Sequence, residues 1–138
     1  MGSSAPVDDG VLGELCDRAV TNPLVARVER DRTAGTLSTV VLVLDDVQYP
    51  GWVEEARLDI RWDTNGDYTF HYIETHEDGD RWQCRWDRHP NPHTSRAQFH
   101  PPPDAHSEDA VPDSHDGAHP DGLFSRTLAN VRERIADC

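Results

Sequence analysis

Residues 52–87 read WVEEARLDIRWDTNGDYTFHYIETHEDGDRWQCRWD, and this stretch decides the fold. It contains three blocks, 52–62, 68–75 and 81–87, in which apolar residues alternate with charged or polar ones. A period of two is typical of β-strands that bury one face. Each of the two polar segments between the blocks contains a glycine, so we expect three strands in an antiparallel meander.

The length of the two connections decides which side chains share a face, because directly opposed residues of an antiparallel pair point the same way. A three-residue loop at 64–66 pairs Trp62 with Tyr68 and gathers the large apolar side chains on one face, and a loop at 77–79 does the same for the next pair. A two-residue turn would instead move Tyr68 to the opposite face. We favour the three-residue loops, since glycine in their third position suits a left-handed residue.

Weaker patterns flank this stretch. Helical spacing of apolar residues predicts a helix on each side, and an alternating block and an apolar run predict two more strands. The expected fold is a single α+β domain over 11–138, in which a five-stranded antiparallel meander sheet packs one face against the C-terminal helix. In chain order we expect a flexible tail at 1–10, a helix at 11–21, strands at 24–32, 36–45, 52–62, 68–75 and 81–87, an irregular His/Pro/Asp-rich loop at 88–121 and a helix at 122–136.

The net charge of the chain limits the kinds of protein to which it can belong. The 138 residues carry a formal net charge of −13, and all 13 basic residues are arginine. An acidic surface without lysine keeps a protein hydrated in concentrated salt, so we expect a protein of a halophile. The same charge argues against a long basic face for nucleic acid, but not against a small site lined by arginines. No apolar stretch approaches the roughly 20 residues of a membrane span, and the start lacks a secretory signal, so we expect a cytoplasmic protein.

The polar face of the expected sheet carries the first candidate site. In the favoured register Asp59 lies opposite His71, and His71 lies opposite Arg85. A carboxylate can orient an imidazole, an imidazole can move a proton, and a guanidinium can hold a phosphate. These are the groups that cleavage of a phosphodiester without a metal requires. A solvated face with ordinary cross-strand ion pairs is the structural alternative.

The second candidate site lies where the last strand of the meander runs into the histidine- and proline-rich segment. Loops that a rigid sheet positions often carry catalytic groups. Imidazoles here could act as general acid or base, with arginines stabilising an anion. The alternative is a metal site formed by three of these histidines with Asp87, although their spacing matches no zinc signature. The residues concerned are Asp87, Arg88, His89, His93, Arg96 and His100.

The order of four segments carries a family resemblance. They are Phe70-His71-Tyr72, Arg85-Trp86-Asp87, the histidines and prolines of 89–93, and Phe99-His100 with three prolines after it. Over roughly residues 24–101 the chain resembles the TumE-like toxins of prokaryotic toxin–antitoxin pairs. The resemblance implies a small toxin that acts on RNA and is neutralised by an antitoxin protein. Carried over position by position, it points to Arg85, Asp87, His89, His93 and His100, with His71 on the preceding strand.

The resulting hypothesis is a ribonuclease toxin that uses neither a metal nor a cofactor. An antitoxin and RNA are its expected partners, no membrane is involved, and a homodimer is a further assembly to consider. The alternative is a non-catalytic acidic module of a halophile that serves protein interaction or dimerisation. The predicted catalytic residues are His71, Arg85, Asp87, His89, His93 and His100, and the predicted substrate-binding residues are Asp59, Arg88 and Arg96.

Overall fold

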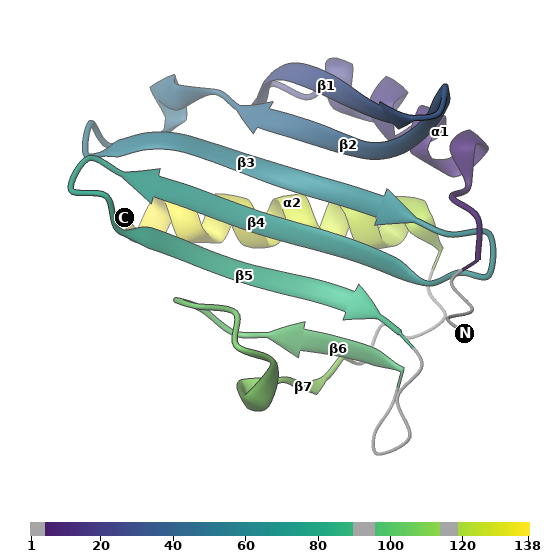
Figure 1. Ribbon diagram of the computed structural model, residues 1–138. Coiled ribbons are helices and arrows are strands. Elements are labelled where there is room, and N and C mark those ends of the chain that lie inside the picture. Colours follow the sequence, from purple (N-terminus) through teal and green to yellow (C-terminus); the bar gives the residue numbers. More distant parts are fainter. Residues whose placement is uncertain (1–4, 90–95, 114–118) are drawn as a thin grey trace.

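The computed structural model describes residues 5–89, 96–113 and 119–138. In these residues, antiparallel strands follow one another in chain order across a single sheet, and two helices lie behind it (Figure 1). The strands are β1 (Val25–Thr33), β2 (Thr36–Leu44), β3 (Val53–Trp62), β4 (Tyr68–His76), β5 (Arg81–Arg88), β6 (Ala97–His100) and β7 (Val111–Pro112). The helices are α1 (Asp9–Val20) and α2 (Pro120–Asp137), with short 3-10 turns η1 (Asp46–Gln48) and η2 (Ser107–Asp109).

The α+β class and the five expected strands are confirmed, but the sheet has seven strands rather than five. The two additional strands, β6 and β7, lie inside the stretch 88–121 that the sequence analysis assigned to an irregular loop. β6 spans four residues and β7 two, so neither is long enough to display a period of two. β6 nevertheless extends the sheet beyond β5, with Arg85 paired to His100 and Asp87 to Gln98.

The predicted register of the meander is confirmed. Trp62 pairs with Tyr68, and the backbone N–H of Asp63 donates to the carbonyl of Asp67 at 2.8 Å, which closes a three-residue loop. Gly66, in the third position of that loop, has φ +87°, and its counterpart Gly79 has φ +90°. Only glycine adopts these angles without strain, so the two glycines fix both loop lengths and the face on which every later side chain lies.

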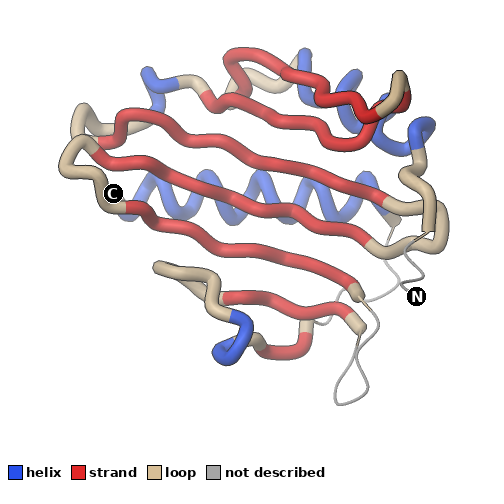
Figure 2. Tube along the Cα trace, viewed as in Figure 1, coloured by secondary structure: helices blue, strands red, loops and turns tan. Residues whose placement is uncertain are grey.

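Both helices cover the same face of the sheet, here called the covered face (Figure 2). The alternate strand residues Leu58, Ile60 and Phe70 are fully buried there against helix residues such as Leu12 and Leu123. No helix among the described residues combines the length and apolarity that crossing a membrane requires.

The two helix starts are capped by side chains. Asp8 caps α1 by accepting a hydrogen bond from Val11 N–H at 3.1 Å. Just before it, Val7 forms a β-bridge with Asp63, so part of the segment expected as a tail is attached to the end of β3. α2 begins at Pro120, two residues earlier than expected, and His119 Nδ1 accepts from Asp121 N–H at 3.1 Å.

A buried carboxylate fixes α2 to the sheet. Glu74 on β4 has no exposed surface, and Arg134 of α2 donates to both of its oxygens at 2.8 Å. Tyr72 and His76 contact the same carboxylate at 2.7 and 2.9 Å. Burial alone disfavours the ionised form, but hydrogen bonds from Arg134, His76 and Tyr72 outweigh it and lower the pKa of Glu74.

The opposite face, here called the open face, carries the polar set of side chains. The charged residues that strand register assigns to it are Arg27, Glu29 and Asp31 on β1, Glu55, Arg57, Asp59 and Arg61 on β3, and Arg81, Arg85 and Asp87 on β5. Arginines and carboxylates are equal in number among them, although the whole chain carries −13. These strand residues of the open face therefore carry no net charge between them, in a chain that is acidic as a whole.

Candidate functional site

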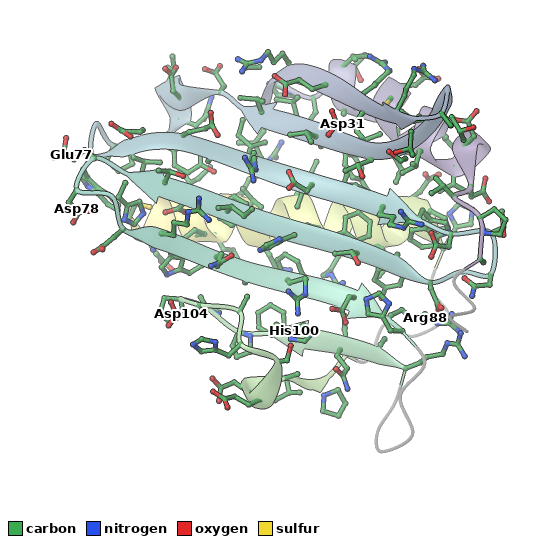
Figure 3. The ribbon with its side chains drawn as sticks, viewed as in Figure 1. Asp31, Glu77, Asp78, Arg88, His100 and Asp104 are labelled. Carbon is green, nitrogen blue, oxygen red and sulfur yellow. The ribbon has the colours of Figure 1, made fainter. Side chains whose placement is uncertain are left out.

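A cleft of about 700 Å³ lies on the open face at the β4–β6 side of the sheet. Its walls come from β4, β5, β6 and the turn η2, and Figure 3 labels His100 on β6 beside β5. The lining residues are Thr69, His71, Arg85, Asp87, His89, Gln98, His100, Ser107 and Ala110. Five of the six residues that the sequence analysis nominated as catalytic are among them.

A row of four side chains crosses the sheet at this cleft. Asp59 pairs with His71, His71 with Arg85, and Arg85 with His100 on consecutive strands. The first three members are the predicted row, and its pairing is confirmed. His100 adds a fourth member, because β6 extends the sheet by one more strand.

His71 is oriented by Gln83 rather than by Asp59. His71 Nε2 lies 2.9 Å from Gln83 Oε1, whereas Asp59 makes its ion pair with Arg57 at 3.3 Å. With the amide oxygen as acceptor, Nε2 carries the ring proton and Nδ1 is left as the basic nitrogen. Burial lowers the pKa of the His71 imidazole, and the charge of Arg85 lowers it further against the opposing effects of Gln83 and Asp59. The ring is thus held in its neutral form near neutral pH.

Burial also acts on the carboxyl group of Asp59. It raises the pKa of Asp59 against the opposing charges of Arg57 and His71. Asp59 lies opposite His71 in the strand register, is partly buried and is outside the lining of the cleft.

The second feature is a cluster around the carboxylate of Asp87, which is nearly buried. Its Oδ2 lies 2.9 Å from Arg85 Nε, 2.9 Å from His100 Nε2 and 3.7 Å from His89 Nε2. His100 Nε2 is close to this oxygen but is not aligned for a hydrogen bond, and this buried nitrogen has no hydrogen-bond partner among the described residues. Arg85 Nη2 also lies 3.3 Å from His100 Nδ1, so these three groups hold one another in place.

The two histidines of the cluster differ in access to solvent. The side chain of His100 is 5% exposed, whereas that of His89 is 57% exposed. His89 can therefore exchange protons with a ligand in the cleft, whereas His100 is packed between Arg85 and Asp87. Proton transfer requires contact with the reacting atoms, so the geometry separates the two imidazoles into different roles.

Two of the predicted substrate-binding residues lie elsewhere. Arg88 donates to Asp67 Oδ1 at 2.8 Å, and Arg96 makes two bonds of 3.1 Å to the same carboxylate. Burial opposes ionisation of Asp67, but Arg96, Asn65 and Arg88 outweigh it and lower its pKa. Both arginines contact Asp67 at the end of the sheet and lie outside the lining of the cleft, so their predicted role in binding substrate stays a prediction.

Several cleft residues were not nominated by the sequence. Gln98, Ser107 and Ala110 come from β6 and from the η2 region. The single alternation in Ala97-Gln98-Phe99-His100 is the signal that could have revealed β6, and the following prolines obscure it. The sixth predicted catalytic residue, His93, lies outside the described residues.

In the described part of the chain, no three His, Cys, Asp or Glu side chains are grouped so that they could hold a metal ion. The metal site considered from the sequence included His93 and so extends beyond that part. All three cysteines are unpaired thiols, with Cys16 and Cys84 buried and Cys138 exposed.

Comparison with known proteins gives one result. The family model described as "Toxin TumE" matches residues 15–135, which is most of the chain and more than the stretch of the initial resemblance. No curated protein and no solved structure matches the chain.

Proposed function

The chain belongs to the TumE toxin family, and we propose that it is the toxin of a toxin–antitoxin pair, acting in the cytoplasm by cleaving RNA without a metal ion. One observation carries the proposal. The Asp87 carboxylate, the Arg85 guanidinium and the imidazoles of His89 and His100 converge in the same cleft as the neutral imidazole of His71. These groups can accept a proton, donate a proton and neutralise a phosphorane.

His71 is the proposed general base. Its Nε2 is engaged with Gln83, so Nδ1 takes the proton from the 2′-hydroxyl of a ribose. The freed 2′-oxygen attacks the adjacent phosphorus, forming a new P–O bond. The lowered pKa of His71 keeps the base unprotonated at neutral pH.

His89 is the proposed general acid, and Arg85 stabilises the charge. As the bond between phosphorus and the 5′-oxygen breaks, His89 donates its proton to that oxygen. The products are a 2′,3′-cyclic phosphate and a free 5′-hydroxyl. Arg85 contacts Asp87 through Nε and His100 through Nη2, so Nη1 is the atom proposed to donate to an equatorial oxygen of the phosphorane. His100 positions Arg85 and Asp87.

The charge balance of Asp87 supports a reaction without metal. The nearly buried carboxylate is compensated by Arg85, with two imidazoles close by. An acidic side chain that is already matched by a guanidinium is a poor ligand for a divalent cation, because binding would leave the arginine unpaired.

The test uses the purified chain and a single-stranded RNA oligonucleotide in the presence of EDTA, at several KCl concentrations. We expect fragments that end in 2′,3′-cyclic phosphate, and no cleavage when the same sequence carries 2′-O-methyl groups. His71→Ala and His89→Ala should each lower the rate by about 10²–10⁴-fold. His106→Ala is the matched control, because His106 is 58% exposed and lies outside the cleft.

Absence of cleavage by the intact chain at every salt concentration would overturn the proposal. The chain would then be the non-catalytic acidic module of the alternative hypothesis, and the cleft would have no catalytic role. Activity that EDTA abolishes and magnesium restores would leave the ribonuclease but contradict the metal-free reaction. Suppression of cleavage by an antitoxin encoded beside this chain would support its place in a toxin–antitoxin pair.

A further inference from the structure

Two arginines of β3 lie on the open face, on the far side of β4 from Arg85. Arg57 and Arg61 lie on either side of Asp59, whose cross-strand partner is His71. We propose that the substrate is single-stranded RNA longer than a dinucleotide, whose backbone leaves the cleft across β4 and is held by Arg57 and Arg61. This inference rests on the proposed function and names its substrate class.

Strand geometry sets the length of RNA that such a site needs. β3 lies two strands from β5, which carries Arg85, and two inter-strand spacings amount to about 10 Å. An extended single strand advances by more per nucleotide than the roughly 3.4 Å rise of stacked bases in a duplex, so this distance spans at most on the order of three nucleotides. A dinucleotide has a single phosphodiester, which would occupy the site at Arg85, so it offers no further phosphate to β3, whereas a longer strand does.

Each of the two arginines has capacity for a phosphate. Arg61 uses Nε on Asp63 at 3.0 Å, and among the described residues its terminal nitrogens have no partner. Arg57 contacts Asp59 through Nε at 3.3 Å and Glu55 through Nη1 only at 4.0 Å. Their side chains are 41% and 43% exposed, so the carboxylates hold one edge of each guanidinium while another edge remains in solvent.

The charges of the strand residues on this face balance one another, which lowers the electrostatic cost of bringing RNA to it. Arginines balance carboxylates on the open face, whereas the chain as a whole carries −13. An RNA strand approaching over the rest of the surface meets a net negative potential. An unpaired strand is favoured over a duplex because His71 is half-buried, and unpaired nucleotides can be splayed away from their neighbours to reach such a group.

The test compares two charge-matched double variants. R57Q/R61Q removes the proposed phosphate contacts, and R18Q/R132Q removes two exposed arginines of the helices. Binding is measured with a 2′-O-methyl RNA of about twelve nucleotides, which resists cleavage, over a range of KCl concentrations. Each phosphate contact with a single strand contributes about 0.7 to the slope of log K against log salt, so R57Q/R61Q should reduce the slope by about 1.4. We expect its affinity to fall about tenfold or more, and R18Q/R132Q to resemble the unchanged protein.

Cleavage separates this inference from the proposed function. Relative to the unchanged protein, R57Q/R61Q should lose more cleavage efficiency on a long RNA than on a dinucleotide. Equal binding of long RNA by R57Q/R61Q and the unchanged protein, or equal losses in both double variants, would overturn the proposed path. If the chain cleaves nothing, the binding measurement still decides this inference. R57K/R61K, which keeps the charge, should recover most of the affinity, and it serves as the second variant if R57Q/R61Q does not fold.

Discussion

Gln83 contacts His71 from the neighbouring strand, with 2.9 Å between Oε1 and Nε2. This bond decides which ring nitrogen of the proposed base is available to substrate. His71 is thus bonded to Gln83 and not to its nearest acidic neighbour, Asp59, which forms an ion pair with Arg57. The relationship leads directly to a pH-dependent test.

We expect Gln83→Glu to move the acidic limb of the pH–rate profile to higher pH. His71 must be unprotonated to act as a base, and its pKa is lowered in the folded protein, so activity should rise through a pH below the ordinary histidine value of about 6.5. A carboxylate in place of the amide stabilises the imidazolium and raises that pKa. The profile of kcat/KM against pH measures the shift. The matched control is Gln48→Glu at an exposed position outside the cleft, and equal shifts in both variants would contradict the assignment of His71 as base.

His89 and His100 should differ in how their loss affects cleavage. His89→Ala removes a proposed proton donor, so single-turnover cleavage should fall while the unfolding midpoint changes little. His100→Ala leaves Arg85 and Asp87 without a buried neighbour, so both stability and activity should fall. His100→Asn, which retains a polar group, should recover part of both losses. Equal, purely catalytic losses in both alanine variants would show that His100 also transfers protons. His93→Ala tests the predicted role of the remaining histidine.

Glu74→Gln should destabilise the fold by about 1.5–3 kcal/mol, because it removes the charge partner of the partly buried Arg134. Urea denaturation measures this change. Glu133→Gln on the exposed side of α2 is the control and should stay within about 0.5 kcal/mol of the unchanged protein. A small loss in Glu74→Gln would indicate that aromatic packing, and not the ion pair, fixes α2.

The same carboxylate makes stability depend on pH in a defined direction. The pKa of Glu74 is lower in the folded protein than its ordinary value of 4.5. Its contribution is therefore present above pH 4.5 and is lost as the pH falls through the lower, folded pKa. Urea denaturation at a series of acidic pH values should show this loss in the unchanged protein and a shallower dependence in Glu74→Gln. Parallel curves for the two proteins would contradict the linkage.

Salt should stabilise the protein well beyond ordinary buffer concentrations. The charge of −13 repels itself, and the Debye length falls from about 10 Å at 0.1 M to about 3 Å at 1 M salt. The thermal unfolding midpoint should therefore rise with KCl. A variant with exposed acids such as Asp46, Glu54 and Asp78 changed to amides should gain less. A midpoint independent of salt would remove the main support for a halophilic origin.

The period of two in residues 52–87 was sufficient to predict the meander and its register. Each one-residue slip would have exposed Trp62, Phe70 or Trp86, so burial of aromatic side chains leaves one acceptable alignment. The row of Asp59, His71 and Arg85 followed from that alignment. The register could not reveal the partner of His71, because several side chains of the open face lie within reach and rotamers decide among them.

Tertiary contacts account for the errors at the edge of the sheet. β6 and β7 are too short to carry a periodic pattern, so β6 is held by pairing with β5 and β7 by pairing with β6. The sequence also does not show that Asp67 contacts both Arg88 and Arg96, two of the predicted substrate-binding residues. This contact forms only in the folded chain, where the loop before β4 lies beside the end of β5.

The carboxylate of Asp67 joins the two ends of the connection between β5 and β6. It binds Arg88 at the end of β5 and Arg96 just before β6, and His89 N–H donates to the carbonyl of Arg96 at 3.1 Å. A change in the length or composition of the chain between these two arginines would therefore leave the ends of β5 and β6 joined through Asp67. The positions of β5 and β6 are thus held relative to each other by a carboxylate from the loop before β4, outside the connection that joins the two strands.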